Sequence, residues 1–344
     1  MKSLIRWTLI VVAAGLLTGC GERKPRLHLY TWADYFKPEL IKEFEKKYKC
    51  RVVIDTFDSN EVMLARIQAG ATGFDLITPS SYMVRTMHQL GMLQQIDPTR
   101  LANIYYVDPE YLAIALDPEM DHSVPYMLTN TGFAYRKSRL EDVEPSWGVF
   151  GREDIRGRAT MLNDMRETLG AALKYLGYSL NSVDEGELAE ARDVVIGWKR
   201  NLAKFENEQY KYGLDSGEFI LVHGYNGDIL QAMEENDDIA FVIPQEGTSI
   251  SCDDFVIPVT ARSTDLAYAF IDFFLEPANA ARNTEYILFL APNEGAYRLL
   301  SEDILNNPSI FMKPEIRKKS EVIDDVGEAL ALYTRMWDQV RAAD

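Results

Sequence analysis

The chain is poor in the residues that build metal sites and disulfide frameworks. Its 344 residues include only three cysteines and four histidines. The cysteines form no C-x-x-C pair, and the histidines, at positions 28, 88, 122 and 223, are not spaced as metal ligands. At most one disulfide can form, so a hydrophobic core must hold the fold. We therefore predict no metal site and no cofactor.

Positive charge is also scarce. The chain has 36 Lys and Arg against 53 Asp and Glu, and its formal net charge is −17. Such a surface repels nucleic acid and anionic lipid, and it raises the local concentration of cations. Nucleic acid is therefore not expected as a partner, whereas a cationic ligand is compatible with the charge.

Long hydrophobic runs are missing except at the N-terminus. Lys2 and Arg6 flank an apolar stretch from Trp7 to Leu17, which is too short to span a membrane. A basic start, a short apolar run and small residues before a cleavage site are typical of a secretion signal, here 1–19. The run ends in Leu-Thr-Gly-Cys, which resembles the bacterial lipobox and predicts that Cys20 is lipidated and becomes the first mature residue. The alternative is an ordinary signal peptide with an incidental cysteine. We expect a protein of the periplasm or cell surface, held to the membrane only by its N-terminal lipid.

The first part of the remaining chain alternates between strands and helices. The apolar runs 27–32, 51–57 and 74–78 are predicted strands. Helices are predicted from Pro38 to Tyr48, from Ser59 and Asn60 to about Ala69, and over 80–90, on the evidence of helical spacing and capping residues. This order predicts a parallel sheet with helices on its faces.

The pattern restarts after Pro125-Tyr126. Predicted strands are 134–135, 159–162, 220–223, 240–243 and 255–259, and predicted helices are 167–176, 185–199, 266–275 and about 326–340, the last with Leu330, Tyr333 and Trp337 on one face. The sequence contains no internal repeat, low-complexity tract or linker rich in Pro, Gly and Ser. We therefore predict two α/β lobes, each a mostly parallel sheet flanked by helices, with a chain that crosses between them more than once.

Four separate segments combine acids with neighbouring polar or aromatic residues. They contain Asp34, the pair Asp164 and Glu167, Asp228, and the pair Asp253 and Asp254. Ligands of open parallel sheets bind beyond the carboxyl ends of the strands, and several of these segments lie there. Each acid also has a structural alternative, because Asp34, Asp164 with Glu167, and Asp228 could cap helices, and the Asp253-Asp254 pair could form a turn. The rings of Trp32, Tyr35 and Tyr82 could likewise serve only packing.

Several motifs at matching spacings resemble the polyamine-binding proteins, the spermidine- and putrescine-binding receptors of bacterial ABC importers. The motifs are Tyr30-Thr31-Trp32-Ala33-Asp34-Tyr35, Phe57-Asp58-Ser59-Asn60-Glu61, Gly73-Phe74-Asp75-Leu76-Ile77-Thr78-Pro79-Ser80, Pro125-Tyr126, Tyr225-Asn226-Gly227-Asp228 and Pro244-Gln245-Glu246-Gly247. The resemblance extends from Leu27 to the C-terminal helix. It implies a two-lobed periplasmic-binding-protein fold of type II, with 27–130 plus 254–298 in one lobe and 131–253 plus 299–344 in the other. It also implies a monomer that closes over a polyamine and delivers it to an ABC permease.

The resemblance also implies which residues bind the ligand. Trp32, Asp34 and Tyr35 match the first binding loop, Ser80 and Tyr82 the loop after the third strand, and Asp164 and Glu167 the acids that open a helix of the second lobe. Tyr225 is found where the family usually has tryptophan, Asp228 matches an acid of the putrescine-type branch, and Asp253 matches the acid that holds an amino group.

Three positions depart from the family pattern. Ser251 replaces a ring that normally stacks on the polyamine methylenes, and Ile323 replaces a glutamine of the spermidine branch. Phe289 or Leu290, depending on the alignment, is found where a tyrosine is usual, and we assign Phe289 to the site. Asp228 and the 57–61 motif favour a diamine, whereas Tyr82 is typical of the spermidine branch, so putrescine and spermidine both stay open.

Three other functions are compatible with parts of this sequence. A surface lipoprotein that senses polyamines and signals to a membrane partner has the same sequence features, as does a binder of another organic cation. An enzyme with paired carboxylates, such as a glycoside hydrolase, would need a raised-pKa acid beside a carbohydrate groove. The acids match a binding family position by position, and the sequence contains no G-x-S-x-G nucleophile motif. We predict that the chain is not an enzyme.

Overall fold

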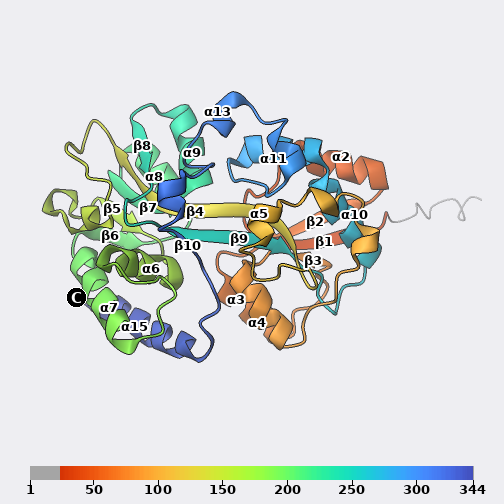
Figure 1. Cartoon of the computed structure of the whole chain (residues 1–344), viewed down its shortest axis with the longest axis horizontal. Coiled ribbons are helices and arrows are strands. Elements are labelled where there is room, and N and C mark those ends of the chain that lie inside the picture. The colour runs from red at the N-terminus through yellow and green to blue at the C-terminus, as the bar shows by residue number, and fades with distance from the viewer. Residues whose placement is uncertain (1–23, 344) are drawn as a thin grey trace, which may run out of the picture.

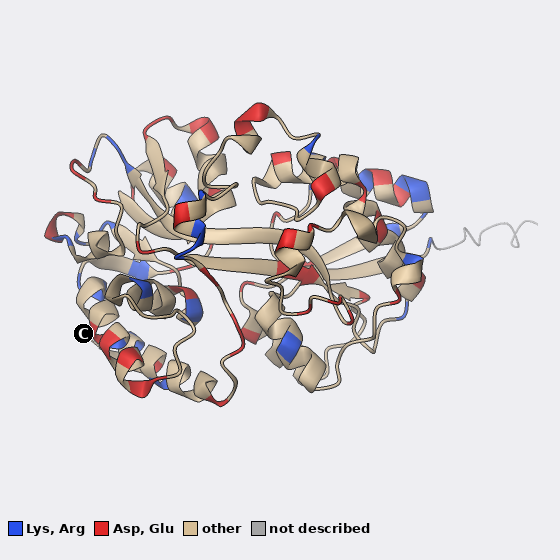
Figure 2. Cartoon of the chain, viewed as in Figure 1, with Lys and Arg blue, Asp and Glu red and all other residues tan. Residues whose placement is uncertain are grey.

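The computed structural model describes residues 24–343 of the chain. The predicted signal peptide, 1–19, and Cys20 lie outside the described residues. Between residues 24 and 343, no helix is long and apolar enough to cross a membrane. Figure 2 shows Asp and Glu spread over the helices and loops of the whole molecule, in keeping with the acidic composition.

The first lobe is built on three parallel strands in the order β2-β1-β3. These strands are β1 (Arg26–Thr31), β2 (Arg51–Thr56) and β3 (Leu76–Ile77), and they alternate with α2 (Pro38–Tyr48), α3 (Asn60–Gln68) and α4 (Ser81–Gln89). Proline begins α2, where a missing N–H is harmless, and Ser59 Oγ caps α3 by accepting a hydrogen bond from Val62 N. The alternation predicted for this part of the chain is confirmed.

Two antiparallel strands connect the lobes. β4 (Val124–Arg136) pairs with β9 (Ser249–Phe255) along its first half, and with β7 (Leu221–Tyr225) and β8 (Ile239–Val242) along its second half. Figure 1 shows β4 and β9 side by side across the middle of the molecule. Two backbone hydrogen bonds of 2.9 and 3.0 Å between Ile77 and Val256 join this pair to β3. The chain therefore crosses between the lobes more than once, as predicted.

The crossover strands are where the predicted boundaries were wrong. Pro125 and Tyr126 lie inside β4 instead of marking a break, and β9 ends at Phe255, where a strand was expected to begin. The register of the β4–β9 ladder shifts between Pro125 and Met127, which accommodates a residue without an N–H. Most residues of β9 are small and polar, so its composition is that of a turn more than of a strand.

The second lobe contains the parallel strands β5 (Ala159–Met161), β6 (Leu202–Phe205) and β7. Three helices, α6 (Met165–Leu176), α7 (Glu185–Lys199) and α15 (Leu330–Ala342), pack against one another beside these strands (Figure 1). α8 (Tyr210–Ser216) and α9 (Asn226–Glu235) lie against β7. Of the three residues predicted to share one face of α15, Tyr333 and Trp337 are buried, whereas Leu330, the first residue of the helix, is 40% exposed. The predicted two-lobed α/β fold is confirmed, with antiparallel crossover strands between the parallel parts.

The other elements are mostly short helices that cover the first lobe or connect the two. They are α5 (Pro109–Leu112), α10 (Thr264–Leu275), α11 (Pro277–Ile287), α12 (Glu294–Tyr297), α13 (Glu302–Leu305), α14 (Pro314–Arg317) and the strand β10 (Glu321–Val322), which extends the sheet beside β9.

Each lobe has its own apolar core. The first includes the rings of Phe36, Phe44, Phe255, Phe270 and Phe274, and the second includes those of Phe133, Trp147, Phe150, Trp198 and Trp337. Ile304 and Ile310 pack into the first core although 299–344 was assigned to the second lobe. The division of the chain at those residue numbers stays a prediction.

One histidine, His223, and the two cysteines of the described chain are buried. His223 is buried beside Trp147, with ring centroids 4.9 Å apart, and neither of its ring nitrogens has a hydrogen-bond partner. Burial lowers the pKa of His223 to about 3, so the ring is neutral. Cys50 and Cys252 are both buried and unpaired. The one disulfide that the composition allows is therefore absent between these two residues.

A glycine in the crossover strand provides a test of this packing. A Cβ at Gly132 would overlap the carbonyl oxygen of Val242 and lie 2.7 Å from the Phe241 ring. We expect Gly132→Ala to lower the free energy of unfolding by about 1–3 kcal/mol, as overpacking does. Gly197→Ala is the matched control, because a Cβ there meets nothing within 4 Å and alanine favours the α7 helix. Urea unfolding of both variants checks this, and equal stability of the two would contradict the packing described.

Candidate functional site

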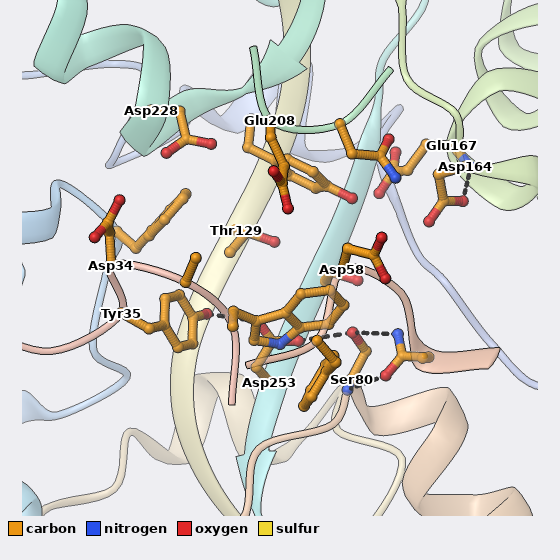
Figure 3. Close-up of a pocket in the computed structure, with 18 of the residues that line it drawn as sticks. Asp34, Tyr35, Asp58, Ser80, Thr129, Asp164, Glu167, Glu208, Asp228 and Asp253 are labelled. Atoms are coloured by element: carbon orange, nitrogen blue, oxygen red, sulfur yellow. Dashed lines mark hydrogen bonds between the residues drawn. The ribbon is translucent and has the colours of Figure 1, made fainter. Parts of the chain in front are cut away.

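A cavity of about 420 Å³ lies between the lobes and is lined by both of them. It collects all eleven residues that the sequence assigned to a binding site, namely Trp32, Asp34, Tyr35, Ser80, Tyr82, Asp164, Glu167, Tyr225, Asp228, Asp253 and Phe289. In Figure 3 Asp228, Glu208, Glu167 and Asp164 lie along the upper edge of the cavity, and Asp34, Tyr35, Asp253 and Ser80 lie along its lower edge.

Asp253 belongs to the crossover strand β9 and lines the cavity from there. Its carboxylate accepts hydrogen bonds from Tyr35 Oη at 2.5 Å and from Ser80 Oγ at 2.7 Å. Burial raises the pKa of Asp253 to about 6, and these two hydrogen bonds limit the rise. Asp253 therefore lies in a strand and not in the turn considered as its alternative.

Asp254, the next residue, faces away from the cavity. Its carboxylate accepts hydrogen bonds from Ser81 Oγ at 2.6 Å and from Cys252 Sγ at 3.2 Å, and it does not line the cavity. Because successive side chains of a strand point to opposite faces, only one acid of the pair can reach the space between the lobes. Burial raises the pKa of Asp254 to about 7.

Asn60 orients two of the predicted residues. Its Nδ2 donates to Ser80 Oγ and to Tyr82 Oη, both at 3.0 Å, while its Oδ1 accepts from Ser80 N at 3.1 Å. Ser80 and Tyr82 are thus fixed by a buried amide that the site prediction omitted, although it belongs to the 57–61 motif.

The loop after β1 supplies Trp32, Asp34 and Tyr35. The Trp32 ring packs on Phe57 with centroids 4.4 Å apart, and its Nε1 is buried without a partner. Asp34 has a φ of 53°, in the left-handed region that aspartate tolerates better than most residues. It does not cap α2, whose N-cap is Lys37. The structural alternative for Asp34 is therefore wrong, and its side chain lines the cavity.

The start of α6 brings two acids together. Asp164 caps the helix by accepting hydrogen bonds from Arg166 N at 2.8 Å and Glu167 N at 3.0 Å, so its capping alternative is correct, but it also lines the cavity. Glu167 instead accepts from Ser249 Oγ at 2.6 Å and Thr131 Oγ1 at 3.0 Å. Burial, followed by the charge of Asp164, raises the pKa of Glu167 to about 8. Burial also raises the pKa of Asp164.

Arg166 also lines the cavity, but its guanidinium is held by hydrogen bonds to other groups. Its guanidinium donates to the carbonyl oxygen of Asp324 at 2.8 Å and to Asn181 Oδ1 at 2.7 Å. It also lies 4.8 Å from the centroid of the Tyr333 ring. These contacts fix the guanidinium, so it lowers the pKa values of Asp164 and Glu167 only in part.

Asp228 lies in the first turn of α9, where Tyr225 is the N-cap. Its carboxylate accepts a hydrogen bond from Tyr210 Oη at 2.5 Å and lies 3.4 Å from Lys211 Nζ. Asp228 is therefore held by side chains of α8 and not by capping its own helix.

The departures from the family pattern also face the cavity. Ser251, Ile323 and Phe289 line it, whereas Leu290 does not line it and belongs to the apolar core of the first lobe. The assignment of Phe289 in place of Leu290 agrees with this placement.

Sequence reasoning did not assign several residues of the lining. These are Ala33, Thr56, Phe57, Asp58, Asn60, Thr129, Arg166, Asn207, Glu208, Lys211 and Tyr212. Phe57, Asp58 and Asn60 could have been found, since the 57–61 motif was recognised. The segment 207–212 has no such signal, because it enters the cavity only through the packing of α8 against β7 and α9.

The lining as a whole has an unusual composition. Seven carboxylates, those of Asp34, Asp58, Asp164, Glu167, Glu208, Asp228 and Asp253, face only two basic side chains, Lys211 and Arg166. Seven rings, those of Trp32, Tyr35, Phe57, Tyr82, Tyr212, Tyr225 and Phe289, complete the walls. Residues 24–343 contain no group of three or more His, Cys, Asp or Glu that could hold a metal ion. The arrangement suits an organic cation with apolar segments.

Comparison with known proteins places the chain in a family. Residues 39–312 match the family of bacterial extracellular solute-binding proteins. The chain belongs to this family. A putrescine/cadaverine-binding protein of Pseudomonas aeruginosa is 30% identical over 96% of this chain and 98% of its own length. A spermidine/putrescine-binding periplasmic protein of Salmonella typhimurium is also 30% identical, over 98% of this chain and 99% of its own.

Solved structures agree with the sequence relatives. The crystal structure of a lipoprotein of Treponema pallidum superposes with a TM-score of 0.83 at 35% identity and covers 92% of this chain and 99% of that one. The spermidine/putrescine ABC transporter substrate-binding protein of Streptococcus pneumoniae has a TM-score of 0.80 at 30% identity, with 92% and 98% covered. Members of a solute-binding family transport and do not catalyse, which confirms that the chain is not an enzyme.

The raised pKa of Glu167 makes stability depend on pH. The folded protein keeps this proton up to about pH 8, whereas an unfolded glutamate loses it near pH 4.3. Raising the pH through this window favours the unfolded state by up to about 1.4 kcal/mol per pH unit for one such group. We expect Glu167→Gln to remove this contribution, so that its free energy of unfolding declines less between about pH 5 and pH 8 than that of the unmodified protein.

Urea unfolding in amine-free buffers at several pH values measures this difference. Glu234→Gln is the control, because Glu234 is an exposed residue of α9 outside the cavity. Parallel pH profiles for the Glu167 variant and the unmodified protein would refute the assignment.

Proposed function

We propose that this chain is the extracytoplasmic receptor of an ABC importer for a polyamine, putrescine or spermidine. The observation that carries the proposal is the cavity with seven carboxylates, seven rings and two basic side chains. A polyamine is a string of ammonium groups joined by methylenes. Carboxylates bind the ammoniums through charge-assisted hydrogen bonds, and rings contact the methylenes and add cation–π attraction. The relatives described above, a putrescine/cadaverine-binding protein and a spermidine/putrescine-binding periplasmic protein, support the same ligand class.

The proposed binding residues are the eleven assigned from the sequence. Asp253 is the central one, because its carboxylate is already oriented by Tyr35 and Ser80. Asp164 and Glu167 face it from the second lobe, and Asp34 and Asp228, on opposite sides of the cavity, both lie toward its left end in Figure 3. A ligand that contacts acids of both lobes binds the closed arrangement better than an open one, and this differential affinity drives closure. The closed form would then dock on the permease.

The N-terminus supports an anchored location. Leu-Thr-Gly-Cys at 17–20 resembles a lipobox, and the similar structure from Treponema pallidum is described as a lipoprotein. We propose that Cys20 carries the lipid, that the protein is a monomer, and that it works in the periplasm or at the cell surface. Mass spectrometry of the protein purified from its native membrane would detect the diacylglycerol on Cys20.

Calorimetric titration tests the ligand class. The mature domain is unfolded and refolded to remove carried-over ligand, then titrated with putrescine, cadaverine, spermidine, spermine and agmatine. Saturable one-to-one binding of at least one polyamine is expected. No binding of any of them would overturn the proposal, and Ser251 and Ile323 would then mark a cavity adapted to another cation.

Substitution of Asp253 tests the central residue. Removing one partner of a buried ion pair costs about 3–5 kcal/mol, and each 1.4 kcal/mol is roughly tenfold in affinity. We therefore expect Asp253→Asn to move a micromolar site toward millimolar affinity. Asp254→Asn is the matched control, since Asp254 is the adjacent buried acid and faces away from the cavity. Retained affinity in the Asp253 variant, or an equal loss in both, would remove Asp253 from the site.

Binding should also release protons. At pH 7 Glu167 is mostly protonated in the free cavity, because its pKa is about 8, and a nearby ammonium would favour its ionised form. The observed binding enthalpy should then differ between phosphate and MOPS buffers, which take up protons with different enthalpies and do not contain a primary ammonium. Glu167→Gln should reduce this buffer dependence. An enthalpy independent of the buffer in the unmodified protein would contradict the predicted proton release.

A further inference from the structure

Lys211 places a primary ammonium inside the acidic cavity. It belongs to the first turn of α8, and its side chain is only 15% exposed. Its Nζ lies 3.4 Å from Asp228 Oδ1. Burial lowers the pKa of Lys211, but the negative charges around it, Asp228 first and Asp34 among the others, outweigh this effect and raise the pKa overall. Lys211 is therefore charged, and it interacts with acids of both lobes.

The position of Lys211 is fixed by its surroundings. Its partner Asp228 is held by the 2.5 Å hydrogen bond from Tyr210 Oη, and Tyr210 Oη in turn accepts a hydrogen bond from Tyr225 N at 3.3 Å. Tyr210 is 1% exposed and precedes Lys211 in the same helix turn. The ammonium is thus tethered to a buried, hydrogen-bonded framework and does not extend from a surface loop.

The acids of the cavity are unequally neutralised. Within the described part of the chain, Lys211–Asp228 is the only salt bridge that involves a carboxylate of the lining. No basic side chain pairs with Asp34, Asp58, Asp164, Glu167, Glu208 or Asp253 among those residues. Figure 3 shows Asp34 and Asp228 on one side of the view and Asp164 and Glu167 on the opposite side. A ligand ammonium thus finds only unpaired acids at one end, whereas at the other end Asp34 is unpaired and Asp228 is already paired with lysine.

We propose that Lys211 determines the length of the ligand, because its ammonium occupies the Asp34–Asp228 end of the cavity where the far ammonium of a long polyamine would otherwise bind. This inference rests on the proposed polyamine function and deepens it. A lysine side chain ends, like a polyamine, in a primary ammonium on a chain of methylenes, so it can satisfy the same acid. A second ammonium at that end meets like charge and no unpaired acid at Asp228, which excludes long ligands and favours short diamines.

A series of linear diamines separates length from charge. 1,4-Diaminobutane, 1,5-diaminopentane, 1,6-diaminohexane and 1,8-diaminooctane carry the same two charges, so a general change in the field of the cavity affects them alike. Their affinities are measured by calorimetry for the unmodified protein and for Lys211→Met, which keeps an unbranched side chain without the charge. Lys137→Met is the control, because Lys137 is an exposed lysine of the second lobe outside the cavity.

In the unmodified protein affinity should decline as the diamine lengthens. In Lys211→Met the affinity for 1,8-diaminooctane relative to 1,4-diaminobutane should rise at least about tenfold, and Lys137→Met should leave that ratio unchanged. An unchanged ratio in Lys211→Met, or equal gains for all four diamines, would overturn the role of Lys211. That outcome differs from failure of the proposed function, in which the unmodified protein binds none of the four diamines and none of the polyamines. Circular dichroism and thermal unfolding of both variants verify that they are folded.

Discussion

The seven carboxylates of the cavity share one space with only two basic side chains, and Glu167 and Asp253 among them are buried. Burial disfavours the charged forms of Asp164, Glu167 and Asp253, and the charge of Asp164 adds to the effect at Glu167. The pKa of Asp253 rises to about 6 because of burial, and the pKa of Glu167 rises to about 8 because of burial and the charge of Asp164, so in the free protein Glu167 keeps its proton near neutral pH. A multivalent cation can replace that proton. The excess negative charge of the site therefore favours a cationic solute over a neutral or anionic one.

The crossover strands make this arrangement possible. β4 and β9 run from one lobe into the other, and they carry Thr129, Ser251 and Asp253 into the space between the lobes. Because the two strands are paired with each other, these residues keep a fixed relation while the loops of either lobe can approach them. Asp253 is held by Tyr35 and Ser80 of the first lobe, and Glu167 is anchored by hydroxyls of β4 and β9. Asp253 of β9 and Glu167 of the second lobe are therefore both positioned by the paired strands β4 and β9. This arrangement suits a protein that closes on its ligand.

Selectivity within the polyamine class has two opposing sources in this cavity. Ser251 lines the cavity where the family resemblance predicts a ring, and loss of that ring would leave more room for the ligand. Lys211 reduces the room at the Asp228 end by placing an ammonium there. Loss of a ring weakens contact with methylenes along the whole ligand, whereas a fixed positive charge acts at one end, where a terminal ammonium would be. The charge of Lys211 discriminates more sharply between ligands of different length, because its effect depends on the position of the ligand's terminal ammonium.

The sequence by itself determined the kind of protein. The alternation of strands and helices predicted the first lobe, the motifs predicted the family, and all eleven assigned residues line one cavity. These features depend on local patterns, such as the proline that begins α2 and the serine that caps α3. Only the tertiary structure decided which of two adjacent acids, Asp253 or Asp254, faces the cavity, that Phe289 and not Leu290 does so, and that Lys211 pairs with Asp228. Each of these depends on strand register or on the packing of α8 against α9, which are contacts between residues that local sequence does not specify.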